Sequence, residues 1–421
     1  MVTMVKPFPV SDPTATHVIV ELFGGDNSLS PFVAGDLAEM SRGLSKAAGN
    51  RFAILALADT SKTGGQVIEL SSAGTQTVIE ELGEIDTGDP DTLAQFIARA
   101  LVTYPTARRA LGFWDHGSGV FDEEDADEVV LDRAVRGRAV RGAHRGVKRR
   151  PGRSLFVRHL VDHHDPALQA GYRAMLEDDS SGGILTNLEA SGVVKAAFAR
   201  AGTTRKFDLI FSDTCLNGMV EVVDQFKAFA SVVVGSEELE PGDGWDYQRF
   251  LGLMAKRPPT TADAWAKQAI DAFHDEYTAR PGEHPCTLAA FRTKHGITTA
   301  FKRLVAATRP LGRDGFRILD DVRADSQSFA GYNSYDLRDF ATRLVDADDP
   351  RLTPAAAAVI EAFDRACIGS TALGADVADA HGLAFWFPSS RGAYLKEGPT
   401  YRKLAFPRAT GWDKLLHDRY G

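Results

Sequence analysis

The first 250 residues alternate between short apolar runs and longer segments in which apolar residues recur every three or four positions. The short runs, rich in β-branched and aromatic residues, predict buried strands. These strands are expected over residues 18–23, 52–58, 110–114, 207–211 and 231–235, with a hairpin over 66–70 and 77–81. The longer segments predict helices over residues 31–44, 91–104 and 188–201. Strands that alternate with helices indicate an α/β fold, with a mostly parallel central sheet covered by helices on both faces.

Two of these helices have recognisable starts. Pro31 suits the first helical position after Ser30 as N-cap, because a residue there has no N–H bond to lose. Either Thr186 or Asn187 can cap the helix over 188–201, since both side chains accept hydrogen bonds from N–H groups of the first turn.

The pattern becomes mostly helical after residue 250. Helices are predicted over residues 261–277, 296–307 and 354–368, another begins at Asp336, and late strands are predicted over 287–292 and 383–387. We therefore divide the chain into an N-terminal extension over residues 1–16, a main α/β domain over 17–250, and a largely helical C-terminal subdomain over 251–421.

Residues 121–181 differ in kind from the rest of the main domain. An acidic patch over residues 122–132 is followed by a basic stretch over 133–153 with eight Arg, one Lys and no acidic residue. Gly and Ala fill the gaps, so the segment can bury little apolar surface, and we expect an exposed loop. Such a loop could be a solvated insertion or could bind nucleic acid without sequence specificity.

Composition limits the remaining possibilities. The net charge of −9 argues against general binding to nucleic acid or to acidic membranes. The three cysteines are widely spaced, so neither a disulfide framework nor a zinc site is expected. No apolar stretch is long enough to span a membrane. Residues 1–16 lack a secretory segment, which predicts a cytoplasmic protein; secretion is the alternative if a signal peptide has been removed.

Polar, Gly-containing loops follow three of the predicted strands, at residues 24–30, 115–119 and 212–218. The carboxyl ends of parallel strands meet at one edge of a sheet, where ligands bind. Cys215 lies in one of these loops, and a helix that begins nearby would favour its thiolate. A single Cys is more often a small buried hydrophobe. His116 follows another strand, and Gly117 beside it would let the backbone approach a substrate closely.

Four stretches together carry a more specific signal. They are Gly25–Leu29, Trp114–Gly119, Ser212–Gly218, and the segment Ser236–Glu238 with Pro241–Trp245. In this order they resemble the clostripain family of cysteine peptidases, which belongs to the caspase, gingipain and legumain-like clan. The resemblance covers roughly residues 17–400 and implies a caspase-like αβα sandwich in the main domain. It also implies Cys215 as nucleophile, His116 as acid and base, and the N–H groups of Gly117 and Cys215 as oxyanion donors.

The resemblance further implies cleavage after Arg and, less often, after Lys. A carboxylate at the bottom of the pocket for the residue before the scissile bond would pair with the guanidinium group. The family's acidic residue stands two before the nucleophile, which is Asp213 here, and Asp243 is a second candidate. Thr214 stands where the family commonly has Ala, and Asn217-Gly218 is also a departure; neither touches the Cys–His pair.

Relatives are matured by cleavage between the catalytic His and Cys, often by themselves. An Arg-specific peptidase with a basic loop there is expected to be a zymogen, cut by itself or by an upstream protease into two chains that stay associated. An intracellular bacterial stress or defence cascade is one setting for such an enzyme. The candidate cleavage positions are Arg133, Arg136, Arg138, Arg141, Arg145, Lys148, Arg149, Arg150 and Arg153.

Two other function classes stay open: an inactive caspase-like scaffold, and a nucleic-acid-binding regulatory protein that uses the Arg-rich loop. The expected partners are peptides or proteins with a basic residue before the cleaved bond, with no membrane and no nucleic acid. No cofactor is expected to be required. Calcium is a further option, because some relatives depend on it and because residues 122–127 or the Asp178-Asp179 pair offer oxygen ligands, although neither follows an EF-hand pattern.

Overall fold

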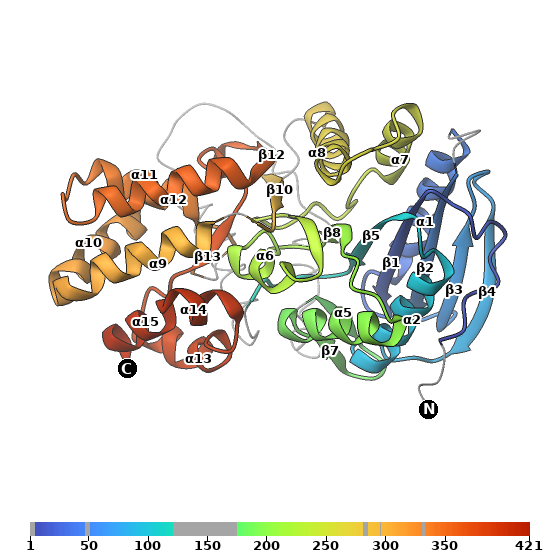
Figure 1. The fold of residues 1–421 in the computed structure, drawn as a ribbon, viewed down its shortest axis with the longest axis horizontal. Helices are drawn as coiled ribbons and strands as arrows, with labels where there is room; N and C mark the ends of the chain where they lie inside the picture. The colour runs from blue at the N-terminus through green and yellow to red at the C-terminus, as the bar shows by residue number, and fades with distance from the viewer. Residues whose placement is uncertain (1–4, 47–50, 121–174, 281–284, 295, 331–332) are drawn as a thin grey trace, which may run out of the picture.

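A nine-stranded sheet forms the centre of the protein (Figure 1). The computed structural model describes residues 5–46, 51–120, 175–280, 285–294, 296–330 and 333–421. The strands lie in the order β12-β10-β9-β8-β5-β1-β2-β3-β4. Their bounds are β1 (His17–Gly25), β2 (Phe52–Thr60), β3 (Gly65–Leu70), β4 (Gln76–Gly83), β5 (Arg108–Trp114), β8 (Phe207–Asp213), β9 (Ala230–Gly235), β10 (Cys286–Arg292) and β12 (Cys367–Leu373).

The sheet is parallel at its centre and antiparallel at its edges. Neighbours pair in parallel from β9 through β8, β5 and β1 to β2. β3 and β4 form an antiparallel hairpin beyond β2, as predicted, and β10 and β12 are antiparallel beyond β9. The predicted αβα architecture with a central parallel sheet is therefore confirmed, with the refinement that both edges reverse direction.

Both faces of the sheet are buried. Along β1, Val18, Val20 and Leu22 belong to one hydrophobic core, while Ile19 and Phe23 belong to the other. This alternation follows from the two-residue period of a strand. The first core includes helices α2 (Pro90–Thr103), α5 (Asn187–Ala201) and α6 (Val220–Phe226), and the second includes α1 (Ser30–Ser45), α7 (Tyr247–Lys256) and α8 (Ala262–Ala279). Figure 1 shows α7 and α8 on one side of the sheet and α2 and α5 on the other.

The predicted N-cap is confirmed for helix α5 but not for helix α1. Thr186 caps α5 in a reciprocal arrangement, in which its hydroxyl accepts from the N–H of Glu189 and the Glu189 carboxylate accepts from the N–H of Thr186. Helix α1 has Pro31 in its first turn, as expected, but its N-cap position is Leu29 and no side chain caps it. The prediction of Ser30 as the cap was therefore wrong.

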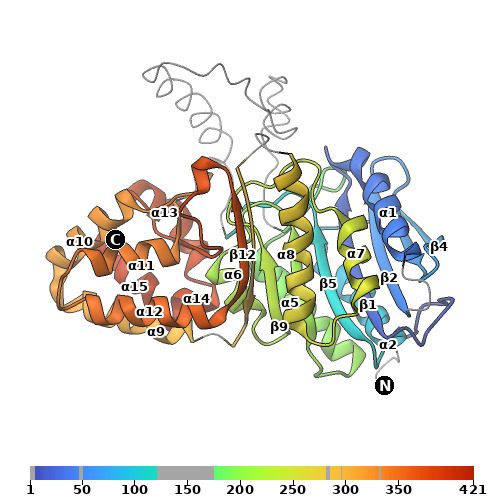
Figure 2. The same cartoon turned by 90° about the horizontal axis from the view of Figure 1, so that it is seen from above.

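The C-terminal part is largely helical and gathers at the β12 edge of the sheet (Figures 1 and 2). Its elements are α9 (Ile297–Thr308), η3 (Arg309–Leu311), α10 (Gly312–Asp325), β11 (Ser334–Asp336), α11 (Leu337–Asp346), α12 (Thr353–Ala366), η4 (Ala375–Val377), β13 (Ala384–Trp386), α13 (Arg391–Tyr401), α14 (Ala405–Thr410) and α15 (Trp412–Tyr420). Two of its strands, β10 and β12, extend the central sheet. The boundary predicted at residue 250 therefore does not coincide with the edge of the sheet.

The late strands and the cysteines can be compared directly with the expectations. The predicted strand over 287–292 is β10, and the one over 383–387 contains β13. The helix expected to reach residue 368 ends at Ala366, and β12, which follows it, was not predicted. All three cysteines are free, as expected. In the parts of the chain that the structure describes, no helix is both long and apolar enough to cross a membrane.

Hydrogen bonds from strand β13 connect the C-terminal part to the segment that follows β8. The N–H of Ala384 donates to the carbonyl of Gly218 over 2.8 Å. The carboxylate of Glu221, in α6, accepts from the N–H of Trp386 over 3.0 Å and from the hydroxyl of Tyr401 over 2.8 Å. Glu221 is fully buried, and this burial raises its pKa to about 7. These contacts are among those that hold the loop after β8 in place.

We expect Tyr401→Phe to destabilise the protein by about 1–3 kcal/mol, because it removes a hydrogen bond from a buried carboxyl group. Urea denaturation followed by tryptophan fluorescence measures this loss. Tyr394→Phe is the matched control, since the hydroxyl of Tyr394 bonds to His417 at an exposed position. Equal effects of the two substitutions would contradict the role given to Glu221.

Candidate active site

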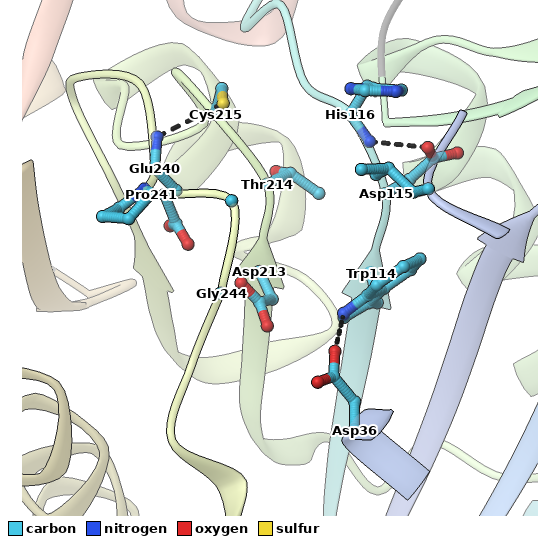
Figure 3. Close-up of a pocket in the computed structure, with 12 residues that line it drawn as sticks. Asp36, Trp114, Asp115, His116, Asp213, Thr214, Cys215, Glu240, Pro241 and Gly244 are labelled. Carbon is cyan, nitrogen blue, oxygen red and sulfur yellow. Dashed lines mark hydrogen bonds between the residues drawn. The ribbon is translucent and has the colours of Figure 1, made fainter. Parts of the chain in front are cut away.

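Parallel strands β5 and β8 bring the two candidate catalytic side chains to one edge of the sheet. Trp114, the last residue of β5, pairs in register with Asp213, the last residue of β8. His116 and Cys215 each follow two residues beyond this pair. Both line the same pocket, and Figure 3 shows them facing each other across its mouth. The structure therefore brings together the Cys and His that the sequence singled out.

Cys215 is held as a thiol. Its side chain is buried, and its Sγ accepts a hydrogen bond from the N–H of Glu240 over 3.3 Å. Burial raises the pKa of the Cys215 thiol, and the carboxyl groups of Glu240, Glu238 and Asp213 raise it further. The sequence suggested a helix N-terminus that would favour the thiolate. That helix, α6, begins at Val220, five residues beyond Cys215.

His116 is oriented by the loop that follows β1. Its Nε2 lies 2.9 Å from the hydroxyl oxygen of Ser28. The backbone N–H of His116 donates to the carboxylate of Asp115 over 2.6 Å. That carboxylate also accepts from the side chain of Asn27 over 2.8 Å and from the N–H of Glu177 over 2.5 Å. Asp115 thus joins the loop after β5 to the loop after β1 and to the segment that contains Glu177. Burial raises the pKa of Asp115 well above the usual range.

Gly117 lies against the backbone of Cys215. A Cβ atom at position 117 would come within 2.2 Å of the carbonyl oxygen of Cys215 and within 2.9 Å of its backbone nitrogen. Only a residue without a side chain fits there. This close approach places the two backbone segments that were predicted to supply oxyanion donors side by side.

The interior of the pocket is acidic. Twelve described residues line it, and none of them is Lys or Arg. Asp213 lies on its wall, where its carboxylate accepts from the N–H of Trp245 over 3.2 Å and from the hydroxyl of Tyr247 over 2.9 Å. Glu240 and Asp36 are two further acidic residues of the lining (Figure 3). The indole N–H of Trp114 donates to Asp36 over 2.7 Å.

Among the described residues of the lining, no Lys or Arg neutralises these acidic groups. Burial raises the pKa of Asp213 and raises that of Glu240 well above its usual range, and Asp213 adds to the shift of Glu240. Burial and the nearby Asp213 raise the pKa of Asp36 to about 8. Burial therefore disfavours the ionised form of both Asp213 and Glu240. Protonation of these carboxyl groups limits the negative charge in the pocket. A cation that enters the pocket would take over this role and allow the carboxyl groups to ionise.

Asp243, the second candidate for this pocket, does not line it. It is exposed and forms an ion pair with Arg280 over 2.5 Å. Glu240, three residues earlier, lies in the pocket instead. The two stretches singled out in the sequence, Ser236–Glu238 and Pro241–Trp245, lie on either side of Glu240 and do not include it. Asp36 gave no signal at all, because a single Asp on a helix normally faces water.

The remaining predicted positions cannot be placed. The candidate cleavage residues between Arg133 and Arg153 lie outside the described residues. The same holds for the acidic patch over residues 122–127 that was considered for calcium. Asp178 and Asp179, the alternative calcium ligands, follow the undescribed segment and are described.

Comparisons with known proteins place this geometry in context. A sequence model of the clostripain family matches residues 22–135 and 162–418, which together make up most of the chain. No curated protein matches the chain. Solved structures are similar in fold at low sequence identity.

Three of these structures cover nearly the whole chain. An inactive zymogen C11 protease from Parabacteroides distasonis has 18% identity and a TM-score of 0.65 over 95% of this chain and 99% of that one. A secreted C11 cysteine protease from Bacteroides thetaiotaomicron, in complex with an irreversible peptide inhibitor, has 17% identity and a TM-score of 0.64 over 94% and 99%. A structure of the secreted C11 cysteine protease "iotapain" from the same species has 12% identity and a TM-score of 0.66 over 94% and 99%.

We expect Cys215 to react slowly with iodoacetamide at neutral pH, because only the thiolate is alkylated and its pKa is raised. Asp213→Asn removes a nearby negative charge, so it should lower the pKa of Cys215 and speed alkylation several-fold. Mass spectrometry of the alkylated peptides measures both rates. Asp243→Asn, which changes an exposed carboxylate, should have no effect. Alkylation of Cys215 at the rate of an unperturbed thiol would contradict this picture.

Proposed function

The chain belongs to the clostripain family and is a cysteine peptidase, and we propose that Cys215 is its nucleophile and His116 its general acid and base. In this mechanism the sulfur of Cys215 bonds to the substrate's carbonyl carbon, and its proton passes to His116. The carbonyl oxygen becomes an oxyanion that accepts from the N–H groups of Gly117 and Cys215. His116 then protonates the leaving amine, and water releases the second product from the thioester.

The observation that carries the proposal is a pocket lined by the thiol, the imidazole and four acidic side chains, with no Lys or Arg among its described lining residues. The four acidic residues are Asp36, Asp115, Asp213 and Glu240. Asp213 and Glu240 together offer four carboxyl oxygens, which suits the planar fork of an Arg guanidinium. A Lys ammonium would neutralise the same charge with fewer directed hydrogen bonds. We therefore assign Asp213 and Glu240 to the recognition of a substrate Arg, with Lys accepted less well, and Asp36 to the surrounding negative field.

The raised thiol pKa fits this specificity. Asp213 and Glu240 are among the groups that disfavour the Cys215 thiolate. A bound Arg would neutralise them, so that ionisation of the thiol becomes easier once a correct substrate is in place. An Asp or Glu at that substrate position would have the opposite effect. Recognition of the side chain and activation of the nucleophile are thus coupled through the same electrostatic field.

We further propose that the enzyme is made as a zymogen and activated by cleavage within residues 133–153. The support is compositional: residues 133–153, which lie between His116 and Cys215, contain eight Arg and one Lys. One similar structure, from P. distasonis, is described as an inactive zymogen. This proposal includes activation by the enzyme itself or by an upstream protease. It also includes a role in an intracellular stress or defence cascade. A cytoplasmic location stays a prediction from the sequence. Two of the similar structures are of proteins described as secreted.

The first experiment is a panel of fluorogenic peptides with Arg, Lys, Asp or Asn before the cleaved bond. We expect turnover in the order Arg, then Lys, with none for Asp. Asp213→Asn should lower kcat/KM for the Arg peptide by about 30-fold or more, because it leaves a buried cation without its charged partner. Glu240→Gln should also lower kcat/KM for the Arg peptide, because it removes a second carboxyl group from the pocket. Asp243→Asn is the control and should match wild type. Faster turnover of the peptide with Asp before the cleaved bond would contradict the assignment of Asp213.

The second experiment separates self-processing from activation by another protease. Wild type and Cys215→Ala are each purified alone and run on a denaturing gel. We expect wild type to appear as two chains and Cys215→Ala as one, and a trace of active wild type to cut the Ala variant within residues 133–153. Equal cleavage of the two purified proteins would show that the cut is not made by this enzyme.

A further inference from the structure

A hollow of about 280 Å³ opens at the end of the sheet opposite the active site. Lys206 stands directly before β8, Ser231 is the second residue of β9, and Arg292 ends the antiparallel strand β10. The hollow therefore lies where β8 and β9 begin. Its volume is near the lower end of the range usual for small-molecule sites, about 300–1,000 Å³. The polar residues of its described lining are Lys206, Ser231, Asp263, Arg292, Thr293 and Lys294.

Positive charge dominates this lining. Three of the polar residues are basic and only Asp263 is acidic, although the whole chain has a net charge of −9. Asp263 is already engaged, because the guanidinium group of Arg292 donates to its carboxylate over 2.8 and 3.0 Å. Within the described part of the chain, neither Lys206 nor Lys294 forms an ion pair. The hollow thus keeps two ammonium charges that no described carboxylate balances.

The charges of Lys206 and Lys294 affect each other. Burial lowers the pKa of Lys206, and the positive charge of Lys294 lowers it further. The ammonium group of Lys206 donates to the carbonyls of Lys227 and Ala230, and one of its hydrogens stays available for a ligand. Lys294 is exposed, and its ammonium group donates to no described residue. An anion beside both Lys side chains would remove this repulsion.

The backbone around the hollow is held by hydrogen bonds. The carbonyl of Ser231 accepts from the N–H of Thr293 over 3.0 Å, and the hydroxyl of Thr293 donates to the carbonyl of Ala230 over 2.8 Å. These bonds fix Thr293, and with it the start of Lys294, against the beginning of β9. The hydroxyl of Ser231 has no partner among the described residues, so it offers a neutral donor on a rigid element.

We propose that this hollow binds a small anion that carries phosphate groups, such as a diphosphate or a phosphate monoester. Arg292 keeps N–H groups that its bonds to Asp263 and to the carbonyl of Arg365 do not use. These groups and the two ammonium groups suit the several charged oxygens of a phosphate. A single carboxylate would engage fewer of these donors and would leave positive charge unbalanced.

The proposed anion site is remote from the reacting groups. The seven residues of β8, at about 3.3 Å each, place Lys206 about 20–25 Å from Asp213. Charges this far apart are largely screened at physiological salt, where the Debye length is about 8 Å. A bound anion would therefore leave the field at Cys215 unchanged. Its expected effect is to hold the ends of β8, β9 and β10 together, which stabilises the fold.

Calorimetric titration with sodium pyrophosphate and, separately, with glycerol 3-phosphate tests the proposal at constant ionic strength. The full chain with Cys215→Ala is used, so that neither self-cleavage nor the proposed peptidase mechanism affects the result. We expect saturable binding of one anion, and a rise in melting temperature of about 3 °C at a hundredfold excess over Kd. Tighter binding of pyrophosphate would identify a diphosphate ligand, and tighter binding of glycerol 3-phosphate a monoester.

Substitutions locate the site. Lys294→Gln should weaken binding of the tighter anion at least about tenfold, because it removes a charge-assisted hydrogen bond. Lys294 is exposed, so the fold should tolerate the change. Lys62→Gln, at an exposed Lys in the turn between β2 and β3, is the matched control and should bind like the parent protein. No saturable binding of either anion, or equal binding by the Lys294 and Lys62 variants, would overturn the proposal.

Discussion

Negative charge that is buried without a basic partner is the constraint on which the functional edge of this protein depends. Asp36, Asp213 and Glu240 gather in the pocket, and Asp26 and Asp59 gather a few residues away along the same strand ends. Proteins seldom bury carboxyl groups in this way, because desolvation disfavours the ionised form. In the pocket, the basic substrate side chain proposed above would balance the charge of these groups.

Asp115 connects these two acidic places. Its carboxylate holds the loop after β1, the loop after β5 and the strand β6 at once, through Asn27, His116 and Glu177. Ser28, in the loop after β1, contacts the imidazole. The hydrogen bond from Asn27 to Asp115 therefore keeps that loop beside His116.

The structure brings predicted residues together where short motifs lie directly after strands. Cys215, His116 and Asp213 are fixed to the sheet edge by at most two residues of chain beyond β5 and β8, so strand order alone brings them together. Asp243 was misplaced because its loop is longer, and the path of such a loop depends on contacts such as the ion pair with Arg280. Glu240 and Asp36 were missed for a related reason: their proximity to Asp213 exists only after a loop and a helix have packed against the sheet.

Strand periodicity and motifs at strand ends are local properties, so the αβα class, the positions of the main strands along the chain, the candidate residues Cys215 and His116 and the family could be predicted from the sequence. The packing of remote segments brings β10 and β12 into the central sheet, buries the thiol of Cys215, and gathers four distant carboxylates near His116. Each of these depends on which groups become neighbours and lose water when remote segments pack. Local sequence carries little information about burial of charge, which is set by the whole fold.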